Sequence, residues 1–300
     1  MFASLIIAGF ECARLEWQNN RCLLTSTDHV PDAQMRQHYE TVKALGMFTA
    51  RDGLPWWLPI EPRLQVARDA GVQVIWDLNH WWRHEAPTDY AKRLVMAVDR
   101  VCPDQPFWCC FNETWLHPVM CPGQSREQVI SEAVDILRML RVNLPDVRLI
   151  TAEPAHVAAE VEAHAELADE AEIIGVNFYP QYAEQTVEEI LHRTAARYPG
   201  KRIMISETGL HSGYAGSWSR PDVHAPEMTK ADWLRKVQAG VERSGVPIDG
   251  ICIYPIVNGT DWHAGGHTRY DNGLIREDGS VDEDFAGAIR MAGQQHAEAA

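Results

Sequence analysis

Short apolar runs recur along the chain, and polar or charged residues follow nearly every one of them. Runs of this kind predict buried strands. Between the runs, apolar residues recur at helical spacing, as in Met35, Tyr39, Val42 and Leu45. Strands that alternate with helices predict a parallel sheet, because each parallel connection needs a crossover. Eight runs are present, at residues 4–8, 47–50, 72–76, 107–111, 147–150, 173–178, 203–205 and 250–256.

Eight strand–helix units in 300 residues predict an α/β fold, a (β/α)8 TIM barrel that forms a single domain over residues 1–300. The alternative is an open, doubly wound sheet. Two observations favour the barrel. No glycine-rich phosphate loop follows the first run, where Gly9 stands alone, and the polar residues do not gather at one switch point. In a barrel the carboxyl ends of all strands converge on one face, where active sites lie.

Capping signals mark the start of three predicted helices. In each, a Ser or Thr is followed three residues later by a side chain that can bond back to the main chain. The pairs are Ser125 with Gln128, Thr186 with Glu189, and Thr229 with Asp232. We also expect residues 154–171 to be helical, for their alanine and glutamate content, and residues 281–297 to form the closing helix.

Charge and cysteine content limit the partners and the compartment. A formal charge of −15 disfavours nucleic acid, anionic membrane surfaces and strongly anionic substrates. Seven cysteines, an odd number without metal-site spacing, indicate a reduced, cytoplasmic protein. The N-terminus lacks the basic segment of a secretory signal, and no run approaches the roughly 18 apolar residues that a membrane span needs.

Two of the runs lead directly into a glutamate. In FWCCFNETW, residues 107–115, the apolar run is followed by Asn112 and Glu113. In ISETG, residues 205–209, it is followed by Ser206 and Glu207. Two carboxylates at the ends of buried strands can act as acid/base and nucleophile on a glycosidic bond. Either one alone could also be an ordinary residue at the solvent boundary. The eleven tryptophans could fill the core or stack on sugar rings, an alternative left open for Trp56, Trp57 and Trp82.

These motifs resemble those of the retaining glycoside hydrolases that share the (β/α)8 barrel, known as clan A, and most closely family 1, the β-glucosidase type. FNETW is similar to that family's Asn-Glu-Pro motif, with Thr114 where Pro is usual. ISETG is similar to its Thr-Glu-Asn-Gly motif, with Thr208 where Asn is usual. The resemblance implies that Glu113 is the acid/base and Glu207 the nucleophile.

The resemblance also implies a set of sugar-binding residues in the same order along the chain. Arg51 stands where the family has an arginine beside the nucleophile, and Asn112 would hold the substrate 2-OH. From the residues alone, an alternative for Arg51 is a salt bridge at the barrel end, and an alternative for His80 is a satisfied interior histidine. Tyr254 stands where the family has a tryptophan. The remaining substrate-binding candidates are Glu11, His80, Trp81, Asn177, Tyr179, Asp261 and Trp262.

The sequence therefore predicts a retaining β-glycosidase that acts on neutral carbohydrates without a cofactor or a metal. One alternative is a sugar-binding barrel with weakened or lost catalysis, because the chain is shorter than the usual family member and cleft-building loops must be missing. Another is a metal-dependent hydrolase on the same fold. Its candidate ligands are the pairs His80/His84 and His263/His267, with Asp77 and Glu85 nearby.

Overall fold

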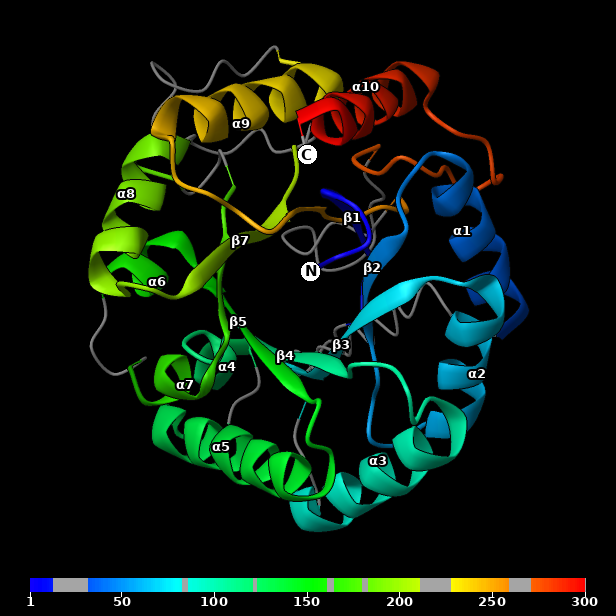
Figure 1. Ribbon diagram of the computed structural model, residues 1–300, viewed down its shortest axis with the longest axis vertical. Coiled ribbons are helices and arrows are strands. Elements are labelled where there is room, and N and C mark those ends of the chain that lie inside the picture. Colours follow the sequence, from blue (N-terminus) through cyan, green and yellow to red (C-terminus); the bar gives the residue numbers. More distant parts are fainter. Residues whose placement is uncertain are drawn as a thin grey trace.

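Eight parallel strands close into a barrel in which each strand pairs with its neighbours along the chain and β1 pairs with β8 (Figure 1). The computed structural model describes residues 1–12, 32–82, 86–120, 123–160, 165–179, 183–210, 228–258 and 271–299. The closed barrel confirms the (β/α)8 prediction over the open sheet. The strands are β1 Ile6–Gly9, β2 Thr49–Gly53, β3 Gln73–His80, β4 Trp108–Asn112, β5 Arg148–Pro154, β6 Ile173–Asn177, β7 Arg202–Thr208 and β8 Ile251–Ile253.

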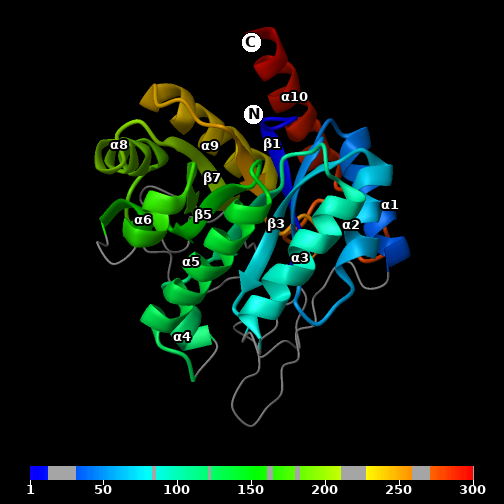
Figure 2. The same ribbon diagram turned by 60° about the horizontal axis from the view of Figure 1, so that its bottom comes forward.

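A ring of helices surrounds the barrel (Figure 1). The short helix α4 lies beyond the end of the barrel toward which β3 points (Figure 2). No helix in the described ranges is long and apolar enough to cross a membrane. The helices are α1 Asp32–Ala44, α2 Ile60–Ala70, α3 Pro87–Val101, α4 His117–Met120, α5 Arg126–Asn143, α6 Ala155–Glu160, α7 Ala165–Glu170, α8 Val187–Arg197, α9 Lys230–Ser244 and α10 Glu283–Ala299.

Each of the eight apolar runs overlaps one strand, but several strands continue beyond their run into polar residues. The clearest case is β3, which extends through Asp77 and Asn79 to His80 although its apolar run ends at Trp76. Main-chain pairing continues there because the buried polar side chains find partners inside the barrel mouth. These buried polar side chains are therefore carried on paired main chain.

The three predicted capping boxes are all formed, at the starts of α5, α8 and α9. The closing helix begins at Glu283, later than predicted, because Asp282 accepts a hydrogen bond from the Phe285 amide and so caps it. The helix predicted over residues 154–171 is two short helices, α6 and α7, in the described part of that segment. Pro154 still belongs to β5.

Strand side chains divide into an inner and an outer apolar layer. The neighbours Cys109 and Cys110 point to opposite sides of β4, the first into the core under the helices and the second into the barrel, as side chains on a strand must. All five described cysteines are free of disulfides. The inner layer is Phe2, Ile7, Ile75, Trp108, Cys110, Ile150, Ala152, Ile173, Met204 and Cys252. Toward the carboxyl ends of the strands, this layer gives way to buried polar side chains.

Candidate active site

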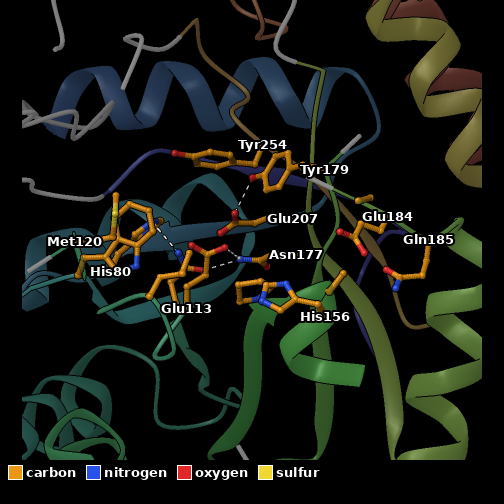
Figure 3. Close-up of a pocket in the computed structure, with 16 residues that line it drawn as sticks. His80, Glu113, Met120, His156, Asn177, Tyr179, Glu184, Gln185, Glu207 and Tyr254 are labelled. Atoms are coloured by element: carbon orange, nitrogen blue, oxygen red, sulfur yellow. Dashed lines mark hydrogen bonds between the residues drawn. The ribbon is translucent and has the colours of Figure 1, made fainter. Parts of the chain in front are cut away.

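A cavity of about 710 Å³ lies at the carboxyl ends of the strands (Figure 3). That volume lies within the range usual for small-molecule sites. Two glutamates, Glu113 and Glu207, lie beside each other in its middle, next to Asn177 (Figure 3). The cavity is lined by His80, Trp81, Asn112, Glu113, Leu116, Met120, Pro154, Ala155, His156, Asn177, Tyr179, Ala183, Glu184, Gln185, Glu207 and Tyr254.

Glu207 has a hydrogen-bond donor on each of its carboxylate oxygens. Arg51 Nη1 lies 2.7 Å from Oε1, in an ion pair buried on both sides. The Tyr179 hydroxyl donates to Oε2 over 2.7 Å. Burial, and then the charge of Glu207, raise the pKa of Tyr179 well above its usual value, so the phenol keeps its proton and remains a donor. Both carboxylate oxygens of Glu207 are therefore held in place, one by a cation and one by a phenol.

Glu113 lies in the opposite electrostatic environment. It directly follows β4, is 8% exposed, and accepts a hydrogen bond from Asn177 Nδ2 over 3.1 Å. Burial raises the pKa of Glu113 well above its usual value, and the negative charge of Glu207 raises it further. Of the two carboxyl groups in the pocket, Glu113 is therefore the one whose raised pKa favours the protonated form.

A single guanidinium, that of Arg51, joins four strands below the pocket. Nη2 donates to Asn112 Oδ1 over 2.8 Å and lies 2.9 Å from Asp77 Oδ2. Nη1 contacts Glu207 and the Ser206 carbonyl, and Nε donates to Cys110 Sγ. Burial acts to raise the pKa of Asp77, but Arg51 and His80 outweigh it, and the pKa is lowered. Asp77 is thus a buried counter-ion that helps hold Arg51 under both Glu207 and Asn112.

The hydrogen bonds around Asn112 determine the tautomer of His80. Asn112 Oδ1 accepts from Arg51 and from Asn177, so the amide nitrogen must be the group that faces His80 Nε2, 2.9 Å away. Nε2 is therefore an acceptor, and the proton of the neutral ring lies on Nδ1. Nδ1 faces Cys12 Sγ at 3.2 Å and Asp77 Oδ2 at 3.4 Å. His80 is thus fixed on both sides of its ring while also lining the cavity.

Cys12, Asp77 and His80 place three potential metal-ligand atoms within 4.8 Å of one another. A metal on His80 Nδ1 would leave a proton on Nε2, and that proton would point at the donating amide of Asn112. Arg51 would add a positive charge beside the same Asp77 carboxylate. The cluster therefore fits a hydrogen-bonded support for Arg51 and His80, and it does not fit a metal centre. The other candidate ligands, His84, Glu85, His263 and His267, lie outside the described residues.

Of the remaining predicted substrate-binding residues, some line the cavity and others do not. Trp81 and Tyr254 line the cavity. Glu11 is buried and accepts a hydrogen bond from the Tyr254 hydroxyl, and it is not among the described residues that line the cavity. Asp261 and Trp262 lie outside the described residues.

Trp57 packs edge-on against both Trp56 and Trp82. Trp82 also donates to the Cys12 carbonyl. None of the three tryptophans is among the cavity-lining residues in the described part of the chain. The structure therefore supports a packing role for these tryptophans rather than stacking on a sugar.

Sequence reasoning missed two kinds of residue. Asp77 and Glu153 follow apolar runs as Glu113 does, and this position was the available signal. Asp77 was considered only beside the candidate metal ligands, and Glu153 was given no role in the site. The rim residues Met120, His156, Glu184 and Gln185 lie on short helices or in loops, where no regular pattern predicts which side chains face a cavity. Figure 3 places Glu184 and Gln185 on the side of the pocket away from His80 and Met120.

Comparisons with known proteins find similarity at the level of structure. No protein-family model matches the chain, and no curated protein sequence matches it. The family 1 β-glucosidase from Thermotoga maritima matches 98% of this chain and 97% of its own, with a TM-score of 0.65 at 12% identity. The exo-β-1,4-mannosidase Op5Man5 from Opitutaceae bacterium strain TAV5 matches 98% of this chain with the same TM-score and identity, and this chain spans 60% of its length.

A third solved structure is that of Bacteroides uniformis β-glucuronidase 2 covalently bound to cyclophellitol-6-carboxylate aziridine. It matches 97% of this chain and 35% of its own, with a TM-score of 0.64 at 14% identity. These similarities confirm that the fold resembles the barrels of clan A glycoside hydrolases over nearly the whole chain. At these identities the likeness establishes the fold alone.

Proposed function

We propose that this chain is a retaining β-glycosidase of neutral sugars, in which Glu207 is the nucleophile and Glu113 the acid/base. The observation that carries the proposal is the pairing of two buried carboxyl groups in one pocket, one held by two donors and the other with a raised pKa. Arg51 and Tyr179 occupy both oxygens of Glu207 with donors, whereas burial and the neighbouring charge raise the pKa of Glu113. Pairs of this kind separate the acid from the nucleophile in glycoside hydrolysis.

In the first step the Glu207 carboxylate attacks the anomeric carbon, and the bond to the leaving-group oxygen breaks as Glu113 gives that oxygen its proton. The product is a glycosyl ester of Glu207 and a free alcohol. Asn112 supports this step, because its amide has a second N–H besides the one directed at His80 Nε2. Such a donor can bind the sugar 2-OH, a contact that strengthens in the transition state.

In the second step water attacks the same carbon and Glu113, now a carboxylate, takes a proton from it. The ester bond breaks, Glu207 is released as a carboxylate, and Glu113 is protonated again. Two inversions give net retention of the β configuration. The charge of −15 disfavours anionic sugars as substrates.

The two glutamates are distinguished by Glu113→Gln and Glu207→Gln variants assayed on an aryl β-glycoside with a good leaving group. We expect Glu207→Gln to abolish turnover, because no other group can attack. Glu113→Gln should still form the glycosyl ester but hydrolyse it slowly. Azide needs no base, so it should restore turnover of the Glu113 variant and give a β-glycosyl azide, identified by proton NMR.

A matched control is Glu61→Gln on α2, whose carboxylate pairs with Arg100 at the surface. It should retain the parent rate within about twofold. A β-azide from the Glu207 variant, or an α-azide from the Glu113 variant, would reverse the two roles. If the parent protein binds sugars but turns over no aryl β-glycoside, the sugar-binding alternative replaces this proposal.

A further inference from the structure

Another buried carboxylate, that of Glu153, contacts the two residues that follow Glu113. Glu153 belongs to β5 and has no exposed surface. Its Oε1 accepts hydrogen bonds from the Thr114 amide over 2.8 Å and from the Thr114 hydroxyl. Its Oε2 accepts from the Trp115 amide over 3.2 Å. Successive main-chain amides that converge on one anion form an anion-binding nest, and here the anion belongs to the protein itself.

The two amides of the nest directly follow Glu113, the proposed acid/base. Glu113 has a φ of 45°, in the left-handed region that non-glycine residues rarely adopt. Such a conformation costs about 1–3 kcal/mol and persists only where the surroundings impose it. The Glu113 amide donates to the Ala152 carbonyl over 2.7 Å. Ala152 and Glu153 therefore hold the main chain of Glu113, Thr114 and Trp115 against β5.

The identity of residue 114 makes this contact specific to the chain. Thr114 supplies two donors to Glu153, its amide and its hydroxyl. Proline, which is usual at this point of the motif that FNETW resembles, has neither donor. A carboxylate at residue 153 and a donor-bearing residue at 114 therefore form one matched unit.

Glu153 also acts on the carboxyl group of Glu113 through its charge. The negative charge of Glu153 adds to burial and to Glu207 in raising the pKa of Glu113. Burial raises the pKa of Glu153 itself to about 7, against the donors of Thr114 and Trp115. The charged side chains that act on Glu153 include Arg126 at the start of α5, which donates to the Trp115 carbonyl and stacks on the Trp115 ring.

We propose that Glu153 is a positioning residue for Glu113: its carboxylate fastens the turn over Thr114 and Trp115 and so aims the acid/base carboxyl at the leaving-group oxygen. The proposal rests on the proposed function of the pocket. Glu153 itself touches no substrate, since it is absent from the cavity-lining residues in the described part of the chain.

The first test is Glu153→Gln, because an amide keeps the shape but has one acceptor oxygen where the carboxylate has two. We expect kcat/KM for a β-glycoside with a poor, alkyl leaving group to fall at least tenfold more than kcat/KM for an activated aryl glycoside, since only the former needs the acid. Azide should accelerate the variant on the aryl substrate and give the β-azide. A role confined to stability would lower both kcat/KM values equally.

The matched control is Glu172→Gln. Glu172 also accepts a main-chain amide of β5, that of Leu149, but at the opposite end of the barrel. We expect its kcat/KM ratio between the two substrates to stay at the parent value. An equal change of the ratio in both variants would overturn the proposal.

A series at residue 114 tests the donors without changing Glu153. Thr114→Ser keeps both donors and should retain the parent ratio, Thr114→Val keeps only the amide, and Thr114→Pro removes both. The ratio of kcat/KM for the alkyl glycoside to kcat/KM for the aryl glycoside should decrease in that order. If Thr114→Pro performs as the parent does, Glu153 does not act through this turn, and this outcome decides the matter even where Glu153→Gln fails to fold.

A titration without substrate separates this inference from the proposed function. With carbon-13 in the glutamate carboxyl groups, NMR follows the protonation of Glu113, assigned from the Glu113→Gln variant. We expect the midpoint of Glu113 to move to lower pH in Glu153→Gln, because a neighbouring negative charge is lost. An unmoved midpoint would overturn the coupling of the two residues, whereas a protein without glycosidase activity but with a moved midpoint would overturn only the function.

Discussion

At the scale of single residues, one arginine determines the geometry of the pocket. Arg51 is 3% exposed and contacts Glu207, Asn112 and Asp77, each on a different strand. A planar guanidinium can direct separate N–H groups at several acceptors, whereas a lysine ammonium is a point charge on a flexible stem. The arrangement of the pocket therefore depends on the shape of this side chain as well as on its charge.

Arg51→Lys keeps the positive charge but loses the planar set of N–H donors. We expect kcat/KM for an aryl β-glycoside to fall about 100-fold or more, because Glu207 and Asn112 lose their common anchor. Steady-state kinetics measures this. The control is Arg63→Lys, which changes a second buried arginine, paired with Asp52, that does not line the cavity. It should lower the melting temperature yet leave kcat/KM within about threefold; equal kinetic losses in both variants would contradict the special role of Arg51.

At the scale of elements, the strands and the two glutamates of the pocket were predictable, because an apolar run and the polar residues that end it are adjacent in the sequence. Glu113 and Glu207 are such residues. The contact of Arg51 with Asp77 and that of Thr114 with Glu153 were not predictable, since each joins residues that are far apart in the sequence. The positions of Met120 and His156 were not predictable either, because α4 and α6 are too short to show a helical period.

Helix α5 provides a test of the link between sequence signals and stability. Ser125 accepts from the Gln128 amide, and Gln128 bonds back to the Ser125 amide. Ser125→Ala should cost about 1 kcal/mol of unfolding free energy, observed as a lower urea midpoint. Ser125→Asp retains an acceptor and should unfold near the parent midpoint. A Ser125→Ala protein as stable as the parent would mean that packing, and not the cap, determines the start of α5.

At the scale of the whole molecule, buried carboxyl groups make stability depend on pH. Glu153 has a pKa of about 7 in the folded protein, above its usual value of 4.5. Between these two values the folded state binds more protons than the unfolded state, so stability falls as pH rises. Asp77, with a lowered pKa, acts in the other direction, and its contribution is lost as pH falls below about 4.

We therefore expect the melting temperature to be highest in mildly acid solution and to decrease from about pH 4.5 to about pH 7, with Glu153 contributing about 3 kcal/mol over that interval. Thermal unfolding monitored by circular dichroism across this range measures the decrease. The glutamine of Glu153→Gln cannot titrate, so the decrease of melting temperature with pH should be shallower in this variant. A melting temperature that rises steadily to pH 7 in the parent would contradict the assignment.

The pairing that closes the barrel has a consequence for how the chain is made. β1 bonds to β8, so that Ile7 lies opposite Cys252. During synthesis, β1 can therefore complete its pairing only after β8 has been made. Until then β1 and β7 each present an unpaired edge, and open edges can pair with another chain. The ring of helices can assemble progressively, but closure of the sheet is a single late event. For a nascent chain, the interval before Ile251–Ile253 emerges is when aggregation competes most strongly with folding.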